Sequence, residues 1–195
     1  GIAGNHVKGQ NSLGIVSIKG REVDEDDVQR AIEASRAIAV PVDREIMHIL
    51  PQNYVVDGQD GIKDPKGMSG VRLEAKVHIV TAASSAIQNI IKSVSRVGLD
   101  IDDIVMEQLA ASESLLSSDE KDLGVAVIDI GGAHTGISIF SEGCIKHTAI
   151  LPLGGNYVTS DIATGLRTPL NEAENIKIKY GCAMTALIPK EETIQ

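Results

Sequence analysis

Aromatic residues are almost missing from this sequence, and cations are outnumbered by acids. The 195 residues include three Tyr, one Phe and no Trp. The core must therefore be built from Ile, Val, Leu and Ala, and no aromatic platform for stacking bases or sugars is expected. Lys and Arg number 18 against 27 Asp and Glu, for a formal net charge of −9. Because nucleic acids and anionic lipids select clustered cations, this balance argues against a general affinity for anionic lipid and predicts no nucleic-acid partner.

Cysteine is scarce, and no long apolar segment is present. Cys144 and Cys182 stand far apart without a Cys-x-x-Cys spacing, and two unlinked thiols are typical of a reducing compartment. No run approaches the ~18 apolar residues of a membrane-spanning helix, and no signal peptide opens the sequence. The sequence begins without Met and stops just after a predicted turn, so we expect it to be a piece of a longer protein.

The first part of the sequence mixes strand and helix patterns. Its predicted strands cover 12–18, 46–50, 54–56, 71–80 and a short buried stretch at 104–106. Its predicted helices cover about 24–38, 84–97 and 108–116. Residues 58–70, rich in Gly and Asp, are predicted to be a loop. Strand 71–80 alternates apolar and polar side chains, which predicts one face on a core and the other, with His78, in water.

A charged hinge at 119–122 is predicted to separate this part from the second. The unbroken apolar run 125–128 is typical of a central strand buried on both faces. It ends at Asp129 and turns through Gly131-Gly132 into a second strand at 137–140, and a third strand runs to Pro152. Two helices are then predicted, one after Gly154-Gly155 and one after Thr168-Pro169.

The stretch from Asp129 to Thr135 is the most informative one for chemistry. A strand delivers a carboxylate to its end, and the pair Gly131-Gly132 lets backbone N–H groups approach a ligand without Cβ atoms in the way. Such a turn suits a phosphate chain, with Asp129 holding Mg²⁺ directly or through water. It lacks the Lys and the helix of a P-loop. The alternative is a tight turn with a surface Asp.

Glu174 and Lys177 are three residues apart on a predicted helix and share one face. Both side chains could therefore reach one ligand, or they could form an exposed ion pair. Metal binding by histidine is not expected, because the other His residues share no ligand spacing with each other or with the cysteines. The acidic run 100–103 is interpreted as a solvated loop and not as a cation site.

Several longer strings resemble the FtsA family of bacterial cell-division proteins, and the resemblance runs almost from end to end. The matching strings are HILPQ at 48–52, GIKDP at 61–65, MSGVRL at 68–73, AKVH at 75–78, GNYVTSDIA at 155–163, and TPLNEAE at 168–174 followed by Ile176-Lys177. The resemblance implies an α/β fold: an actin-like (ribonuclease H-like) lobe with a small α+β insertion subdomain of the FtsA type.

The resemblance also implies a domain organisation and a nucleotide site. Residues 4–80 would form the insertion subdomain, 81–118 the remainder of the first lobe and 124–195 the start of the second. The cofactor would be ATP with Mg²⁺, with Asp129 as the possible Mg²⁺ residue and no catalytic residue in this chain. The nucleotide-binding residues that it implies are Asp129, Gly131, Gly132, Ala133, Thr135, Glu174 and Lys177.

The phosphate turn departs from the family pattern Asp-x-Gly-Gly-Gly-Thr-x-Asp at three positions. The third Gly is Ala133, the Thr is His134 and the last Asp is Gly136. The hydrogen bond from the family's Thr hydroxyl to phosphate is lost unless the Thr135 hydroxyl supplies it. His134 is interpreted either as a phosphate partner or base, or as an exposed turn residue. The resemblance therefore predicts nucleotide binding without efficient hydrolysis.

The function that the resemblance implies is a scaffold, not an enzyme. Such a protein binds ATP, polymerises and tethers the FtsZ ring to the cytoplasmic membrane, at whose inner face it is located at the division site. Later division proteins would contact the insertion subdomain, and the membrane link would be a C-terminal helix that this sequence lacks. With part of the site missing, weak ATP binding is expected. The alternatives are an Hsp70-like or sugar-kinase-like ATPase and a PilM-type pilus assembly protein.

Overall fold

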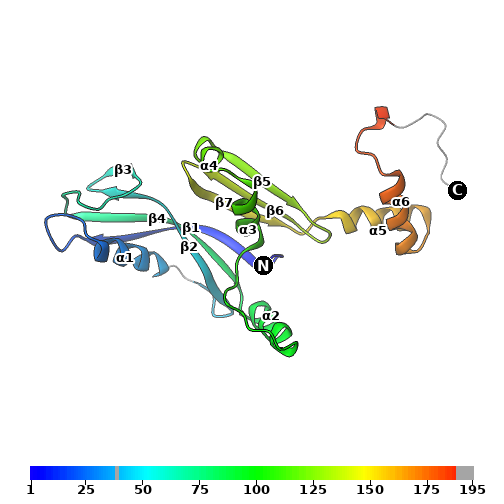
Figure 1. Ribbon diagram of the computed structural model, residues 1–195, viewed down its shortest axis with the longest axis horizontal. Coiled ribbons are helices and arrows are strands. Elements are labelled where there is room, and N and C mark those ends of the chain that lie inside the picture. The colour runs from blue at the N-terminus through cyan, green and yellow to red at the C-terminus, as the bar shows by residue number, and fades with distance from the viewer. Residues whose placement is uncertain (38–39, 188–195) are drawn as a thin grey trace.

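Two antiparallel sheets and their flanking helices make up the computed structural model, which describes residues 1–37 and 40–187 (Figure 1). The first sheet has the strand order β1-β4-β2-β3 and the second the order β5-β6-β7. The strands are β1 (Val7–Ser17), β2 (Arg44–Val56), β3 (Gln59–Ile62), β4 (Arg72–Ala83), β5 (Val125–Ile130), β6 (Thr135–Ser141) and β7 (Cys144–Leu151).

The helices lie around these sheets, and the last two project from one end of the second sheet (Figure 1). They are α1 (Glu25–Ala34), α2 (Ser84–Arg96), α3 (Glu107–Leu115), α4 (Ser118–Leu123), α5 (Gly155–Leu166) and α6 (Leu170–Tyr180), with short 3₁₀ turns at Ser35–Ala37 and Thr185–Leu187. None of the helices in these described ranges has the length and apolarity needed to cross a bilayer.

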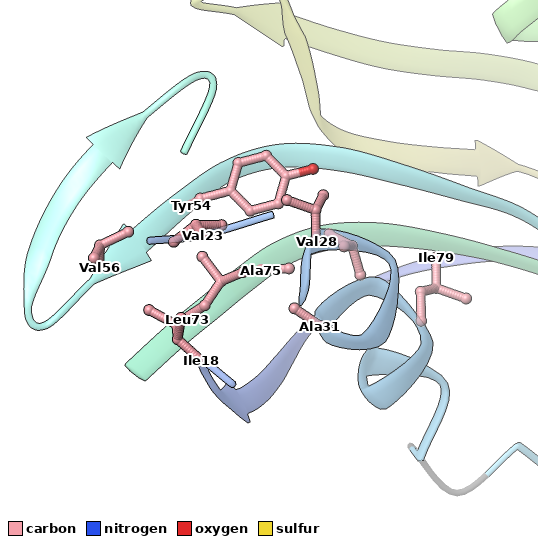
Figure 2. Packing of buried hydrophobic residues seen from close by; sticks show 10 residues of the cluster. Ile18, Val23, Val28, Ala31, Tyr54, Val56, Leu73, Ala75 and Ile79 are labelled. Atoms are coloured by element: carbon pink, nitrogen blue, oxygen red, sulfur yellow. The ribbon is translucent and has the colours of Figure 1, made fainter. Parts of the chain in front are cut away.

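The first core lies between α1 and one face of the first sheet (Figure 2). Asp24 caps α1 in a capping box with Asp27, and this arrangement satisfies free N–H groups in the first turn. The missing side chain of Gly14 lets the helix approach β1, because a Cβ there would lie 1.8 Å from the Ala31 carbonyl oxygen. The buried members of this core are Ile18, Val23, Val28, Ala31, Tyr54, Val56, Leu73, Ala75, Val77 and Ile79.

The second core lies on the other face of β4, where β7 packs against β1, β2 and β4. It joins the two sheets and also receives Ile2, Met106 of the segment before α3, and Ile87 of α2. The other buried members are Val7, Val80, Ala82, Val127, Phe140 and Ile145. Both faces of the second half of β4 are therefore buried.

Burial of the second face overturns the predicted exposure of His78. Its side chain is 1% exposed. Its Nδ1 hydrogen-bonds Asn11 Oδ1 at 2.6 Å and its Nε2 hydrogen-bonds Thr148 Oγ1 of β7 at 2.8 Å. The alternation in the strand correctly predicted the face toward α1, but it could not show that a second sheet covers the opposite one.

Three local predictions in the first part are also wrong or incomplete. Residues 46–50 and 54–56 belong to one strand, β2, whose register against β4 shifts between Pro51 and Asn53. Pro51 is tolerated because β3 pairs with β2 only near Tyr54 and Val56, so no strand needs an N–H from Pro51 on that side. The predicted loop 58–70 contains β3. Helix α1 ends at Ala34, and the expected helical residue Ile38 lies outside the described residues.

Three further corrections concern the later segments. The predicted strand 104–106 is reduced to a parallel bridge between Met106 and Ile2. The predicted hinge at 119–122 is helical, because Ser117 and Glu120 form a capping box that begins α4. Strand β5 is an edge strand with one exposed face, where Ile128 is 59% exposed, so the prediction of burial on both faces is wrong.

The buried His78 predicts a pH-dependent contact between the sheets. Burial lowers the pKa of His78 to about 4, whereas an unfolded His titrates near 6.5. The unfolded chain therefore binds the proton first, and the free energy of unfolding should fall between pH 6.5 and pH 4 by up to about 3 kcal/mol.

Urea unfolding at pH 7 and pH 4.5 measures this dependence. The variant His78→Gln should lose most of it, and the exposed His147→Gln should keep it. Equal pH dependence in wild type and His78→Gln would contradict the assignment.

Candidate functional site

The turn between β5 and β6 docks on the first residues of α5. Within the turn, the Gly131 N–H donates to the His134 carbonyl at 3.0 Å. The carbonyl oxygens of Gly131 and Gly132 accept hydrogen bonds from the N–H groups of Gly155 at 2.9 Å and of Asn156 at 2.8 Å. These bonds satisfy two N–H groups that a helix start leaves unpaired, and they fix the turn relative to α5.

Glycine is required at this contact for close approach. A Cβ on Gly154 would lie 2.5 Å from the Gly131 carbonyl oxygen and 2.6 Å from the Gly132 carbonyl oxygen. The hydroxyl of Thr135 strengthens the same junction by donating to the Leu153 carbonyl at 2.7 Å. The Thr135 hydroxyl is thus engaged with the protein itself.

The groups that the turn leaves free are those that a phosphate and its cation require. Among the described residues, the N–H groups of Gly132, Ala133 and His134 have no hydrogen-bond partner. The carboxylate of Asp129 likewise makes no hydrogen bond or ion pair within the described part of the chain, and it is half-buried. Free N–H groups on successive residues can donate to an anion, and an unpaired carboxylate on the preceding strand suits a hydrated divalent cation.

Glu174 and Lys177 form an ion pair on α6, and that pair lies against α5. The Lys177 Nζ is 2.7 Å from Glu174 Oε2 and donates to Thr159 Oγ1 at 2.9 Å and to the Gly155 carbonyl at 3.2 Å. Hydrogen bonds from Lys177 and Thr159 lower the pKa of Glu174. Gly155 thus contacts the turn through its N–H group and Lys177 through its carbonyl. This residue brings together the turn after Asp129 and the Glu174–Lys177 pair.

Two residues of α3 also face the turn, and sequence reasoning did not single them out. Glu107 Oε2 lies 3.6 Å from His134 Nε2. Gln108 is 1% exposed and fills the space beside Gly136, where a Cβ would lie 2.0 Å from its Nε2. Gly136 stands where the family pattern has its last Asp. Because Gly136 has no side chain, Gln108 can occupy this space, and the substitution was the sequence signal that could have pointed to Gln108.

Across residues 1–37 and 40–187, no group of three or more His, Cys, Asp and Glu side chains could hold a metal ion. His48 Nε2 accepts a hydrogen bond from the Met106 N–H at 3.1 Å, and burial lowers the pKa of His48. Any cation at the turn would therefore have Asp129 as its carboxylate and would complete its shell with water, phosphate or amide oxygen.

The fold and the turn define an actin-like α/β protein with an inserted α+β domain. The solved structure of a PilM–PilN type IV pilus biogenesis complex has the same fold, with a TM-score of 0.60 and 20% identity over 87% of this chain and 48% of that chain. At this identity the likeness concerns the fold alone.

The family follows from two family models that together match most of the chain. The model described as "SHS2 domain inserted in FTSA" matches residues 4–81, and the model "Cell division protein FtsA" matches residues 126–195. The chain belongs to the FtsA family of cell division proteins.

Individual relatives agree with the family models. The chain is 55% identical over 195 residues to the cell division protein FtsA of Pseudomonas aeruginosa. It is 51% identical over 183 residues to that of Neisseria meningitidis and 41% identical over 194 residues to that of Escherichia coli K12. These alignments cover 94% to 100% of this chain but only 44% to 47% of the relatives, so the chain spans about half their length.

The glycine contact under the turn predicts opposite effects for two substitutions. Gly154→Ala places a Cβ against two carbonyl oxygens and should lower the free energy of unfolding by about 1–3 kcal/mol, because neither backbone can move aside easily. Gly165→Ala, which meets open space inside α5, should raise it by about 0.5–1 kcal/mol. Urea denaturation measures both. Equal effects of the two substitutions would show that the turn is not docked on α5.

Proposed function

We propose that this chain contributes one wall of an ATP site in a cell-division scaffold. The observation that supports this most strongly is the shared contact at Gly155, whose N–H bonds the turn after Asp129 and whose carbonyl accepts from Lys177. Phosphate groups and the sugar of one nucleotide would be held on opposite sides of this residue. The division role itself rests on membership in the FtsA family.

Each group has a chemical task in this proposal. The free N–H groups of the turn donate to phosphate oxygens, and Asp129 holds a water shell of Mg²⁺, which neutralises phosphate charge. Glu174 accepts hydrogen bonds from ribose hydroxyls, and Lys177 orients it through their ion pair. The Asp129 carboxylate, which has no partner among the described residues, is compatible with a hydrated cation.

We further propose that ATP acts as a conformational ligand and not as the substrate of an efficient hydrolase. Bound nucleotide would bias closure of the two lobes and hence the contacts between subunits of a polymer. The space that an Asp at position 136 would need is occupied by Gln108. The packing of Gln108 against Gly136 supports a site without the second Asp of the family pattern, and hence a site without efficient hydrolysis.

The remaining roles follow the family resemblance. The scaffold would tether the FtsZ ring to the inner face of the cytoplasmic membrane and polymerise with copies of itself. Its insertion domain would recruit later division proteins. Leu13 and Ile15 are exposed on the edge strand β1 and give that domain an apolar surface for such contacts.

The chain by itself should bind ATP weakly, because it carries one wall of the proposed cleft. Calorimetric titration of the 195-residue chain with ATP and Mg²⁺ tests this expectation. A submicromolar dissociation constant would show that the residues described here suffice for tight binding, contrary to the proposal.

In the complete protein that contains this chain, Lys177→Met should weaken ATP binding about 10-fold by releasing Glu174, the equivalent of about 1.4 kcal/mol. Asp129→Asn should abolish the Mg²⁺ dependence of binding. The control is Lys179→Met, on the same helix but exposed, which should bind as wild type does. Titration with a fluorescent ATP analogue measures all four proteins. Unchanged affinity in both site variants would refute the nucleotide site.

A further inference from the structure

Two Asp-Gly pairs lie on the hairpin of β2 and β3 at the edge of the first sheet (Figure 1). Asp57-Gly58 joins the two strands, and Asp60-Gly61 lies within β3. Asp-Gly is the sequence in which an aspartyl side chain closes most readily on the following backbone nitrogen, because glycine has no Cβ to obstruct the ring. The sequence signal is therefore the same at both pairs, but the structure surrounds the two carboxyl groups differently.

The carboxylate of Asp57 is bound to another segment of the chain. Its Oδ1 accepts hydrogen bonds from the N–H groups of Val71 at 3.1 Å and of Arg72 at 2.8 Å, and its Oδ2 accepts from Val71 at 3.0 Å. These bonds fix the carboxylate on the beginning of β4 and stabilise its ionised form, which is a poor electrophile. Ring closure onto the nitrogen of Gly58 would first have to break them.

Asp60 lies at a bulge and interacts with its own glycine. The register of β2 against β3 shifts between Tyr54 and Val56. Two residues of β3 face one residue of β2 at this shift, and they are Asp60 and Gly61. A bulge leaves its extra residue outside the ladder. The Gly61 N–H donates to Asp60 Oδ1 at 2.7 Å, which brings the nitrogen close to Cγ, the carbon bonded to that oxygen. Gly61 has a φ of +77°, and a Cβ there would meet nothing within 4 Å, so the surroundings leave room for a ring.

We propose that Asp60 is a site of succinimide formation and conversion to isoaspartate in the folded protein, and that Asp57 is not. The nitrogen of Gly61 attacks Cγ of the neutral carboxylic acid. A Cγ–N bond forms, and the acid hydroxyl leaves with the N–H proton as water. Water then opens the ring. Cleavage at the main-chain carbonyl leaves an isoaspartyl linkage, and cleavage of the new Cγ–N bond restores aspartate. The cycle releases one water and consumes one, so it needs no other reactant.

Lys76 of β4 slows this reaction without preventing it. Its Nζ lies 2.5 Å from Asp60 Oδ2. The hydrogen bond from Lys76, followed by that from the Gly61 N–H, lowers the pKa of Asp60, and Lys146 of β7 adds a weaker attraction. These groups reduce the fraction of neutral acid, which is the form that can lose a hydroxyl as water. The Asp60 side chain is 57% exposed, so solvent screens the pair and its effect is modest.

Conversion would change the edge of the inserted domain. An isoaspartyl linkage carries the backbone through the side-chain carbon, so it adds one methylene to the path of β3. Ile62 follows immediately, pairs with Tyr54 and packs partly buried against the first core. A longer backbone before Ile62 would disturb this pairing and this packing. The inference is independent of the proposed nucleotide site, because none of these residues belongs to it.

Ageing of the 195-residue chain at neutral pH tests the proposal. Methyl transfer by an isoaspartyl methyltransferase measures the amount of isoaspartate, and peptide mapping by mass spectrometry locates it. In the folded chain, conversion at Asp60 should be about 10-fold faster than at Asp57, because near-attack geometry is present at only one of them. In urea the two Asp-Gly pairs lose their different surroundings and should convert at similar rates.

Three variants separate the roles of the side chains. Asp60→Glu keeps a carboxylate for Lys76 but would have to close a larger ring, so it should abolish the signal at this position. Lys76→Gln should raise the rate at Asp60 about 3-fold, the scale of an exposed ion pair. Lys92→Gln, exposed on α2, is the matched control and should age as wild type does. Circular dichroism verifies that each aged chain is folded.

Three results would overturn the inference. Equal conversion of the two Asp-Gly pairs in the folded chain would show that the sequence alone sets the rate. Conversion of Asp60 in urea but not in the folded chain would show that the bulge prevents ring closure. An unchanged rate in Lys76→Gln would contradict the part assigned to Lys76.

Discussion

Burial of β4 on both faces is the constraint on which the rest of the structure depends. One face of this strand forms the core of the inserted domain with α1, and the other meets the β5–β7 sheet through Val80 and Ala82. Between the two sheets lies a polar contact centred on His78, whose ring is hydrogen-bonded from both sides. Burial of apolar side chains supplies the attraction between the two sheets. The buried His78 ring needs both Asn11 and Thr148 as hydrogen-bond partners, so it favours the one arrangement of the sheets that provides them.

The proposed site depends on a second backbone contact, that of the β5–β6 turn with α5. Gly131 and Gly132 use their carbonyl oxygens to bond the start of α5, and among the described residues the N–H groups of Gly132, Ala133 and His134 stay without a partner. The first N–H groups of α5 are bonded by the turn, so in the proposed site the free N–H groups of the turn, and not those of the helix, would donate to the phosphate. Gly155 then connects this turn to α6, because its carbonyl accepts a hydrogen bond from Lys177.

Local pattern predicted much of this molecule, and it failed where distant segments meet. The start of the first helix near residue 24 and the turn at Gly131-Gly132 follow from capping and glycine chemistry, which involve neighbours in sequence. The run 125–128 was misinterpreted because an apolar strand indicates burial without showing which faces are covered. Gln108 was missed because its meaning comes from Gly136, a residue 28 positions away in sequence.

The sequence by itself determined the α/β class, the strand–turn–strand unit after Asp129 and the resemblance to a division-protein family, since these depend on spacing and on strings of residues. Only the tertiary structure decided that His78 is buried, that Gly155 links the turn to Lys177, and that the buried amide of Gln108 lies against Gly136. The physical reason is that burial and hydrogen-bond satisfaction are properties of contacts between segments. A pattern within one segment cannot specify what another segment covers.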